Sequence, residues 1–81
     1  MKLPRNMDAP KLIRSLQRLG YTVERQTGSH VRLRCDIPSA HALTIPNHSP
    51  IKVGTLAAIL KDVAAARNLT VASLLELVLA T

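Results

Sequence analysis

The 81-residue chain has little of several residue types on which other small domains depend. Its single cysteine, Cys35, excludes an internal disulfide and a zinc site built on paired cysteines. It has one tyrosine and no phenylalanine or tryptophan, which disfavours RNA-binding modules that stack bases on exposed aromatic rings. Only five residues are acidic, and they are scattered, so a two-metal nuclease built on clustered carboxylates is disfavoured too.

Long hydrophobic runs and cofactor motifs are also missing. No apolar stretch approaches the ~20 residues of a membrane span, and the first residues lack the apolar segment of a signal peptide. With one unpaired cysteine, this favours a cytoplasmic protein that does not enter a membrane. The histidines lack zinc-site spacing, and no glycine-rich phosphate loop is present, so we expect no metal and no nucleotide cofactor.

What the chain does have is positive charge, concentrated in its first half. The formal net charge is +6. Residues 1–35 hold eight basic and two acidic side chains, whereas the remaining residues hold three of each. This asymmetry is typical of a surface that meets a polyanion, although charge alone fits a solvated basic face without a ligand equally well.

The hydrophobic pattern predicts the element order α-β-β-β-α-α. Apolar residues recur at helical spacing in the first and the last two segments, where residues suited to capping mark several of the ends: Asp8, Gly20, Asn68 and Thr70. Between them, two alternating segments separated by a Thr-Gly-Ser turn predict a β-hairpin, and a third strand follows. The expected helices are Asp8–Gly20, Val53–Arg67 and Val71–Leu79, and the expected strands are Tyr21–Gln26, His30–Cys35 and His41–Ile45.

These elements predict one two-layer α+β domain over residues 1–81. Each amphipathic helix must bury its apolar stripe, and a three-stranded antiparallel sheet offers one apolar face. Every second residue from Val31 to Cys35 is apolar, and successive strand residues point to opposite sides, so these residues face the core. The other sheet face is expected to stay open, and it carries His30, Arg32 and Arg34.

A histidine among cations, next to a Gly-Ser turn, fits RNA cleavage without a metal. Imidazole can take the proton of a ribose 2′-hydroxyl, whose oxygen then attacks the adjacent phosphate, and arginines can stabilise the developing charge. His30 is therefore the candidate catalyst, with Arg32 and Arg34 as phosphate contacts. Gly28 permits close approach of RNA, and the Ser29 hydroxyl can bind a phosphate or orient the imidazole. On spacing alone, a histidine that merely begins a strand on a solvated face is the more frequent case.

Two further groups are candidate substrate contacts. His48, in the connection after the third strand, could approach the sheet edge as a second acid or as a substrate contact. His41 is in phase with Leu43 and Ile45, and it is expected to be a partly buried or loop-edge histidine instead of a catalyst. Lys52, with the free amides near Gly54 and Thr55, forms a candidate anion site at a helix start, although ordinary helix initiation explains the same residues.

Together these segments resemble the HicA toxin family over nearly the whole chain. The matching segments are Leu3-Pro4-Arg5, Gly20-Tyr21, Gly28-Ser29-His30, Leu43-Thr44-Ile45-Pro46 with His48, and Gly54-Thr55-Leu56 with Ile59-Leu60-Lys61. The resemblance implies a fold similar to the double-stranded RNA-binding domain and an mRNA endoribonuclease, or interferase, that acts without a metal. It also implies a HicB antitoxin that blocks the active face, and it assigns the catalytic role to His30.

Two other functions stay open at this point. A non-catalytic double-stranded RNA-binding module would use the same fold and charge to recognise helix shape and 2′-hydroxyls. It would bind RNA in a salt-sensitive manner and tolerate the loss of His30. A family member kept only as an interaction protein would bind an antitoxin without cleaving RNA, but the intact Gly-Ser-His segment argues against it.

Overall fold

The computed structural model describes residues 3–80, and its element order confirms the predicted α-β-β-β-α-α fold. Each element begins and ends within two residues of its predicted limits. Among the described residues, no helix has the length and apolar character needed to cross a membrane. The elements are α1 (Ala9–Arg18), β1 (Thr22–Thr27), β2 (His30–Cys35), β3 (His41–Pro46), α2 (Val53–Arg67) and α3 (Val71–Leu79).

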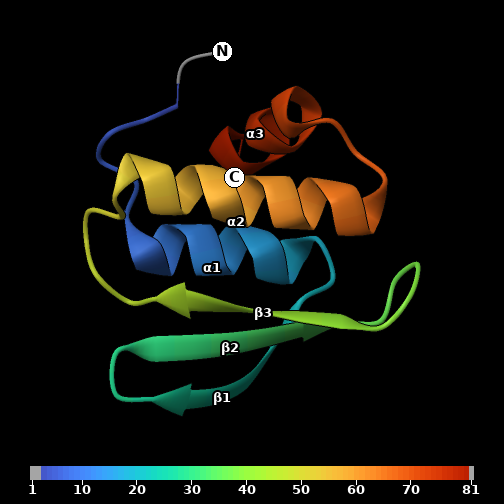
Figure 1. Cartoon of the computed structure of the whole chain (residues 1–81), viewed down its shortest axis with the longest axis horizontal. Helices are drawn as coiled ribbons and strands as arrows, with labels where there is room; N and C mark the ends of the chain where they lie inside the picture. Colours follow the sequence, from blue (N-terminus) through green and yellow to red (C-terminus); the bar gives the residue numbers. More distant parts are fainter. Residues whose placement is uncertain (1–2, 81) are drawn as a thin grey trace.

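The molecule has two layers, a sheet and the helices that cover one of its faces (Figure 1). The sheet is antiparallel with strand order β1-β2-β3. Helices α1 and α2 both pack on β3, and α3 packs on α1 and α2. Strand β1 lies at the edge farthest from the helices, and all six of its residues are exposed (Figure 1). The face opposite the helices is open, as predicted.

The core lies between the helices and the covered face of β2 and β3. In β2 the burial alternates residue by residue, which confirms the predicted core face. In α1, Leu12 and Leu16 are fully buried, and Ile13 and the C-cap residue Leu19 pack against the core from its margin. The largest fully buried apolar side chains are Leu12, Leu16, Leu33, Ile45, Ile51, Leu56, Leu60 and Leu74.

The β1–β2 hairpin brings an additional arginine onto the open face. Its two-residue turn is Gly28-Ser29, and Gly28 has a φ of 58°, a left-handed conformation that favours glycine. A β-bulge at Glu24 then shifts the register of β1. Because of this shift, Arg25 pairs with Arg32 and faces the same side of the sheet.

The start of α1 differs from the predicted side-chain cap. Asp8 occupies the N-cap position but makes no capping hydrogen bond. The Ser49 hydroxyl instead accepts a hydrogen bond from the Ala9 amide at 3.2 Å and donates one to Asp8 Oδ1 at 2.6 Å. The Ile51 amide donates to the Met7 carbonyl at 2.9 Å. These bonds fix the segment that leads into α2 against the beginning of the described chain.

Candidate functional site

The open sheet face carries three arginines and one histidine among small side chains. Residues directly opposite each other in neighbouring strands share a face, so the register defines this surface. Between the charged residues lie a few threonines and an alanine of β1 and β3, which leave the cationic groups accessible. These three arginines and the histidine are Arg25, Arg32, Arg34 and His30, and all four are exposed.

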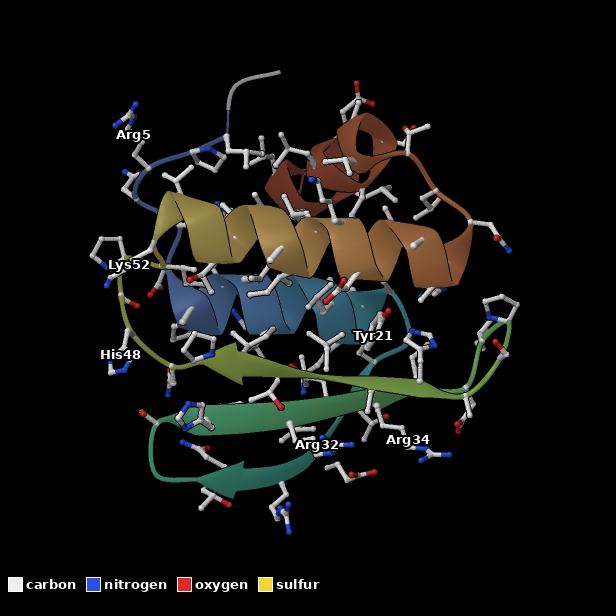
Figure 2. All side chains as sticks on the ribbon, in the orientation of Figure 1. Arg5, Tyr21, Arg32, Arg34, His48 and Lys52 are labelled. Carbon is white, nitrogen blue, oxygen red and sulfur yellow. The ribbon has the colours of Figure 1, made fainter. Side chains whose placement is uncertain are left out.

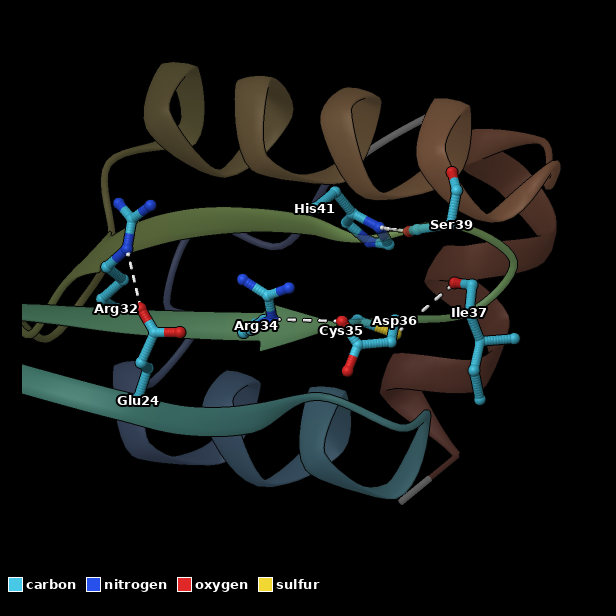
Figure 3. A network of polar contacts seen from close by, with 8 residues as sticks. All are labelled: Glu24, Arg32, Arg34, Cys35, Asp36, Ile37, Ser39 and His41. Carbon is cyan, nitrogen blue, oxygen red and sulfur yellow. Dashed lines mark hydrogen bonds and ion pairs between the residues drawn. The ribbon is translucent and has the colours of Figure 1, made fainter.

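Two of these arginines are oriented by exposed acids. Arg32 Nε donates to Glu24 Oε1 at 3.2 Å, and Arg34 Nε donates to Asp36 Oδ1 at 3.1 Å (Figure 3). The four side chains are 42–70% exposed, so each ion pair contributes only ~0–1 kcal/mol. Each pair uses Nε, and a guanidinium has further N–H donors that can contact a phosphate. The acids therefore hold the arginines without blocking them.

Arg25 and Arg32 lie directly opposite each other on adjacent strands. Like charges in this position destabilise a sheet. Glu24 offsets one of the two charges, and the other remains unbalanced on the open face. An anion bound here would relieve that repulsion.

His30 lies at one end of the open face. It begins β2 and pairs directly with Pro46 at the end of β3. At ~3.3 Å per residue along the strand, Arg32 is about 7 Å and Arg34 about 13 Å from His30. The structure therefore brings Arg32 near His30 and places Arg34 farther along the sheet.

Beside His30 the surface forms a hollow of about 250 Å³, which we call the α2 hollow. Its buried wall is Ile51, and His48 and Lys52 are exposed at its rim. Figure 2 shows His48, Lys52 and Arg5 along the same side of the molecule. The lining residues are Pro46, His48, Pro50, Ile51, Lys52 and Thr55. The structure thus brings two predicted contacts, His48 and Lys52, to the end of the sheet where His30 lies.

The first turn of α2 forms the other side of the hollow. Lys52 is the N-cap residue and makes no capping hydrogen bond with its side chain, and no acidic residue lies in this turn. The first amides of a helix have no partner within the helix, and its dipole favours an anion there. Gly54 is exposed, and a Cβ at this position would meet no atom within 4 Å, so the helix start is accessible. Anion binding by Lys52, Gly54 and Thr55 stays a prediction.

His41 lies at the other end of the sheet and has a structural role, as its position in phase with the core predicts. Its Nδ1 lies 2.7 Å from the Ser39 carbonyl, and its Nε2 lies 2.7 Å from the Tyr21 hydroxyl (Figure 3 shows the first contact). A carbonyl only accepts, so Nδ1 is the donor to Ser39, and in the tautomer with a proton on Nδ1 alone Nε2 accepts the tyrosine proton. The Arg67 guanidinium lies 5.9 Å from the centre of the Tyr21 ring.

The buried tyrosine gives a prediction for alkaline pH. Burial raises the pKa of Tyr21 above its ordinary value of 10.0, Cys35 adds to the rise, and Arg67 opposes it. The unfolded chain then loses this proton first, so the contribution of Tyr21 to stability is complete below about pH 10 and is lost as the pH rises further. We expect the free energy of unfolding in urea to fall more between about pH 9 and pH 11 in the wild type than in Tyr21→Phe. Equal losses in the two proteins would contradict the assignment.

Three features of the site are not evident from the sequence. Arg25 joins the open face only because the bulge at Glu24 interrupts the strand alternation, and no local motif marks that bulge. Ser49 acts across 41 residues on Asp8, so no spacing rule reveals it. The α2 hollow is assembled from the end of β3, the following segment and the first turn of α2, and the sequence predicts His48, Lys52 and Thr55 only as separate contacts.

Comparison with known families identifies the chain. Residues 9–64 match the family model described as the HicA toxin of bacterial toxin–antitoxin systems. The match runs from the start of α1 to near the end of α2, so it includes the Gly28-Ser29-His30 turn and the α2 hollow. No match was found among curated proteins or among solved structures. The family implies a toxin role and an antitoxin partner, and the chain belongs to the HicA toxin family of bacterial toxin–antitoxin systems.

Proposed function

We propose that this toxin is an mRNA endoribonuclease that acts without a metal and uses His30 as its catalytic residue. The observation that carries the proposal is the position of His30. It is exposed beside the Gly28-Ser29 turn within the family match, at the end of a cationic sheet face and next to the α2 hollow. An imidazole in such a place has both access to RNA and neighbouring positive charge.

The proposed reaction is an internal transesterification. His30 takes the proton of a ribose 2′-hydroxyl, the O2′ atom attacks the adjacent phosphorus, and the bond from phosphorus to O5′ breaks. The departing O5′ takes up a proton, for which His48 is the candidate donor. The products are a 2′,3′-cyclic phosphate on one fragment and a 5′-hydroxyl on the other. Arg32 stabilises the charge that develops on the phosphate oxygens.

The remaining predicted residues hold the substrate. Arg34 contacts a phosphate farther along the open face, and Lys52 with the amides of Gly54 and Thr55 contacts one at the start of α2. At the hairpin, a Cβ on Gly28 would meet no atom within 4 Å, so RNA can approach the turn closely, with the half-buried Ser29 beside it. The proposed antitoxin is of the HicB type, and it blocks catalysis by covering the same cationic face.

The activity itself is tested by incubating the purified protein with a long single-stranded mRNA in EDTA. We expect discrete fragments whose 5′ ends are labelled by polynucleotide kinase without prior phosphatase treatment, because transesterification leaves a 5′-hydroxyl. RNA that is bound but stays intact would instead support the non-catalytic RNA-binding module. RNA that is neither bound nor cut would contradict both functions.

Removing two arginines from the open face tests the predicted phosphate contacts. We expect Arg32→Ala combined with Arg34→Ala to weaken RNA binding. The slope of log K for binding against log salt concentration should become shallower by about 1.4, since each phosphate contact to a single strand contributes about 0.7. The measurement is fluorescence anisotropy with uncleavable 2′-O-methyl RNA over a series of salt concentrations. Arg14→Ala combined with Arg18→Ala removes the same charge from exposed positions of α1 and should change the slope less. An unchanged slope in the open-face variant would rule out these contacts.

A further inference from the structure

We propose that the α2 hollow is a nucleobase subsite, which takes the base of one unpaired nucleotide next to the phosphate that His30 attacks. This inference rests on the proposed ribonuclease function and adds a specificity determinant to it. Neither the family match nor the resemblance in the sequence assigns a ligand to this hollow. Its size, lining and position relative to His30 support the assignment.

The size and walls of the hollow suit a single flat ring system. Its volume of about 250 Å³ lies below the ~300 Å³ at which pockets for drug-sized ligands begin. Ile51 is 2% exposed and forms an apolar wall together with Pro46 and Pro50. Tyr21 is the only tyrosine in a chain without phenylalanine or tryptophan, and it is buried in the core, so no such ring is available for stacking. Apolar contact in the hollow can take the place of stacking on the faces of a base.

The rim supplies the polar half of a nucleotide site. The Lys52 ammonium only donates hydrogen bonds, whereas the Thr55 hydroxyl and the His48 ring can each donate and accept. These groups match the carbonyl and ring-nitrogen edge of a base and the phosphate attached to it. No acidic residue is among the lining residues, so the charge of the hollow is complementary to RNA. A purely apolar ligand would use none of these three polar groups.

The position of the hollow determines which base would enter it. Pro46 lines the hollow and is the direct partner of His30, and opposing Cα atoms in an antiparallel sheet are ~4.5–5.5 Å apart. RNA with a phosphate at His30 therefore has a neighbouring base within reach of the hollow. The walls are also held in place: the Asn47 amide donates to the Ser29 carbonyl at 2.6 Å, and Ser49 is bonded to the start of α1. Preorganised walls favour a specific subsite.

The experiment combines a filled hollow with RNAs that each lack one base. Thr55→Leu adds bulk inside the hollow with a residue of good helix propensity. Ala65→Leu adds a leucine at an exposed position of the same helix, outside the hollow, and is the matched control. The substrates are short RNAs with one mapped cleavage site, and each carries an abasic ribonucleotide at a different position near that site. Circular dichroism checks that the three proteins have the same fold.

In the wild type and in Ala65→Leu, we expect one position beside the cleaved phosphate at which loss of the base lowers kcat/KM ~10-fold, equivalent to about 1.4 kcal/mol. In Thr55→Leu, the intact RNA should already be cleaved more slowly, and removal of that base should change kcat/KM by less than about twofold. The proposal is overturned if no single base matters to the wild type. It is equally overturned if the sensitive base matters as much to Thr55→Leu.

A binding series separates the subsite from catalysis. The same abasic positions are placed in uncleavable 2′-O-methyl RNA, and Kd is measured for the three proteins. If the protein binds RNA without cleaving it, the ribonuclease proposal fails, but a ~10-fold base effect on Kd that is lost in Thr55→Leu still supports the subsite. An absence of RNA binding, or a base effect equal in all three proteins, overturns the subsite.

Discussion

His30→Ala is expected to slow RNA cleavage by ~10²–10⁴-fold, the contribution of a general acid or base. The side chain is exposed at the start of β2, so its removal leaves no cavity and should not change the free energy of unfolding appreciably. RNA affinity should fall only slightly, because the arginines of the open face remain. The measurement is a single-turnover cleavage rate with EDTA present, accompanied by a urea melt of each protein.

A histidine at the opposite end of the sheet provides the control. His41→Gln removes an imidazole that contacts Tyr21 and Ser39. Under conditions in which this variant is folded, it should cleave RNA at the wild-type rate. Cleavage at the wild-type rate by a folded His30→Ala protein would assign the chemistry to another residue or to a contaminating nuclease. An equal loss of cleavage in the folded His30→Ala and His41→Gln proteins would contradict a catalytic role specific to His30.

Leu33→Ala is expected to destabilise the protein by ~2–5 kcal/mol, the usual cost of truncating a buried leucine. Leu33 is completely buried, and it lies on the core face of β2, the central strand. Small domains have total stabilities near the low end of ~5–15 kcal/mol, so this one change should leave much of the protein unfolded at 37 °C. The free energy of unfolding is measured by urea denaturation followed by circular dichroism.

The neighbouring strand supplies a matched comparison. Val23 is the direct partner of Leu33 and shares its face of the sheet, yet it is 38% exposed because the helices do not extend over β1. Val23→Ala should therefore lower the free energy of unfolding by well under half as much as Leu33→Ala does. Comparable losses for the two variants would mean that β1 is covered in solution, in conflict with the open edge described above.

Local patterns were sufficient to predict most of the fold. The alternation along β2 follows from strand geometry, and the Gly-Ser turn follows from the backbone that a two-residue hairpin needs. Asn68 adopts the left-handed conformation at the end of α2, and the Thr70 hydroxyl accepts from the Ser73 amide at 3.0 Å at the start of α3, both at the predicted ends. In each case the interaction that determines the local structure lies within a few residues of the sequence pattern that predicts it.

The features that local patterns could not predict depend on contacts between distant segments. Asp8 has a residue type suited to capping, but Ser49 takes over that role because tertiary packing brings it to the helix start. Arg25 lies on the open face because the bulge at Glu24 shifts its register with β2, and no local pattern of its own strand marks that bulge. Likewise, the sequence proposed His48 and Lys52 separately, and only the fold places them on the rim of one hollow.

The exposed strand β1 has a consequence for how the protein moves. With all six residues in solvent and hydrogen bonds to one neighbour only, β1 should open in local fluctuations far more often than the core unfolds. His30 and Arg32 lie instead on β2, which is held on both sides. The proposed catalytic group therefore lies on the more rigid central strand, and Arg25 lies on the more mobile edge strand. In the proposed complex, the Arg25 side chain can follow the path of an RNA chain while the His30 imidazole stays in place.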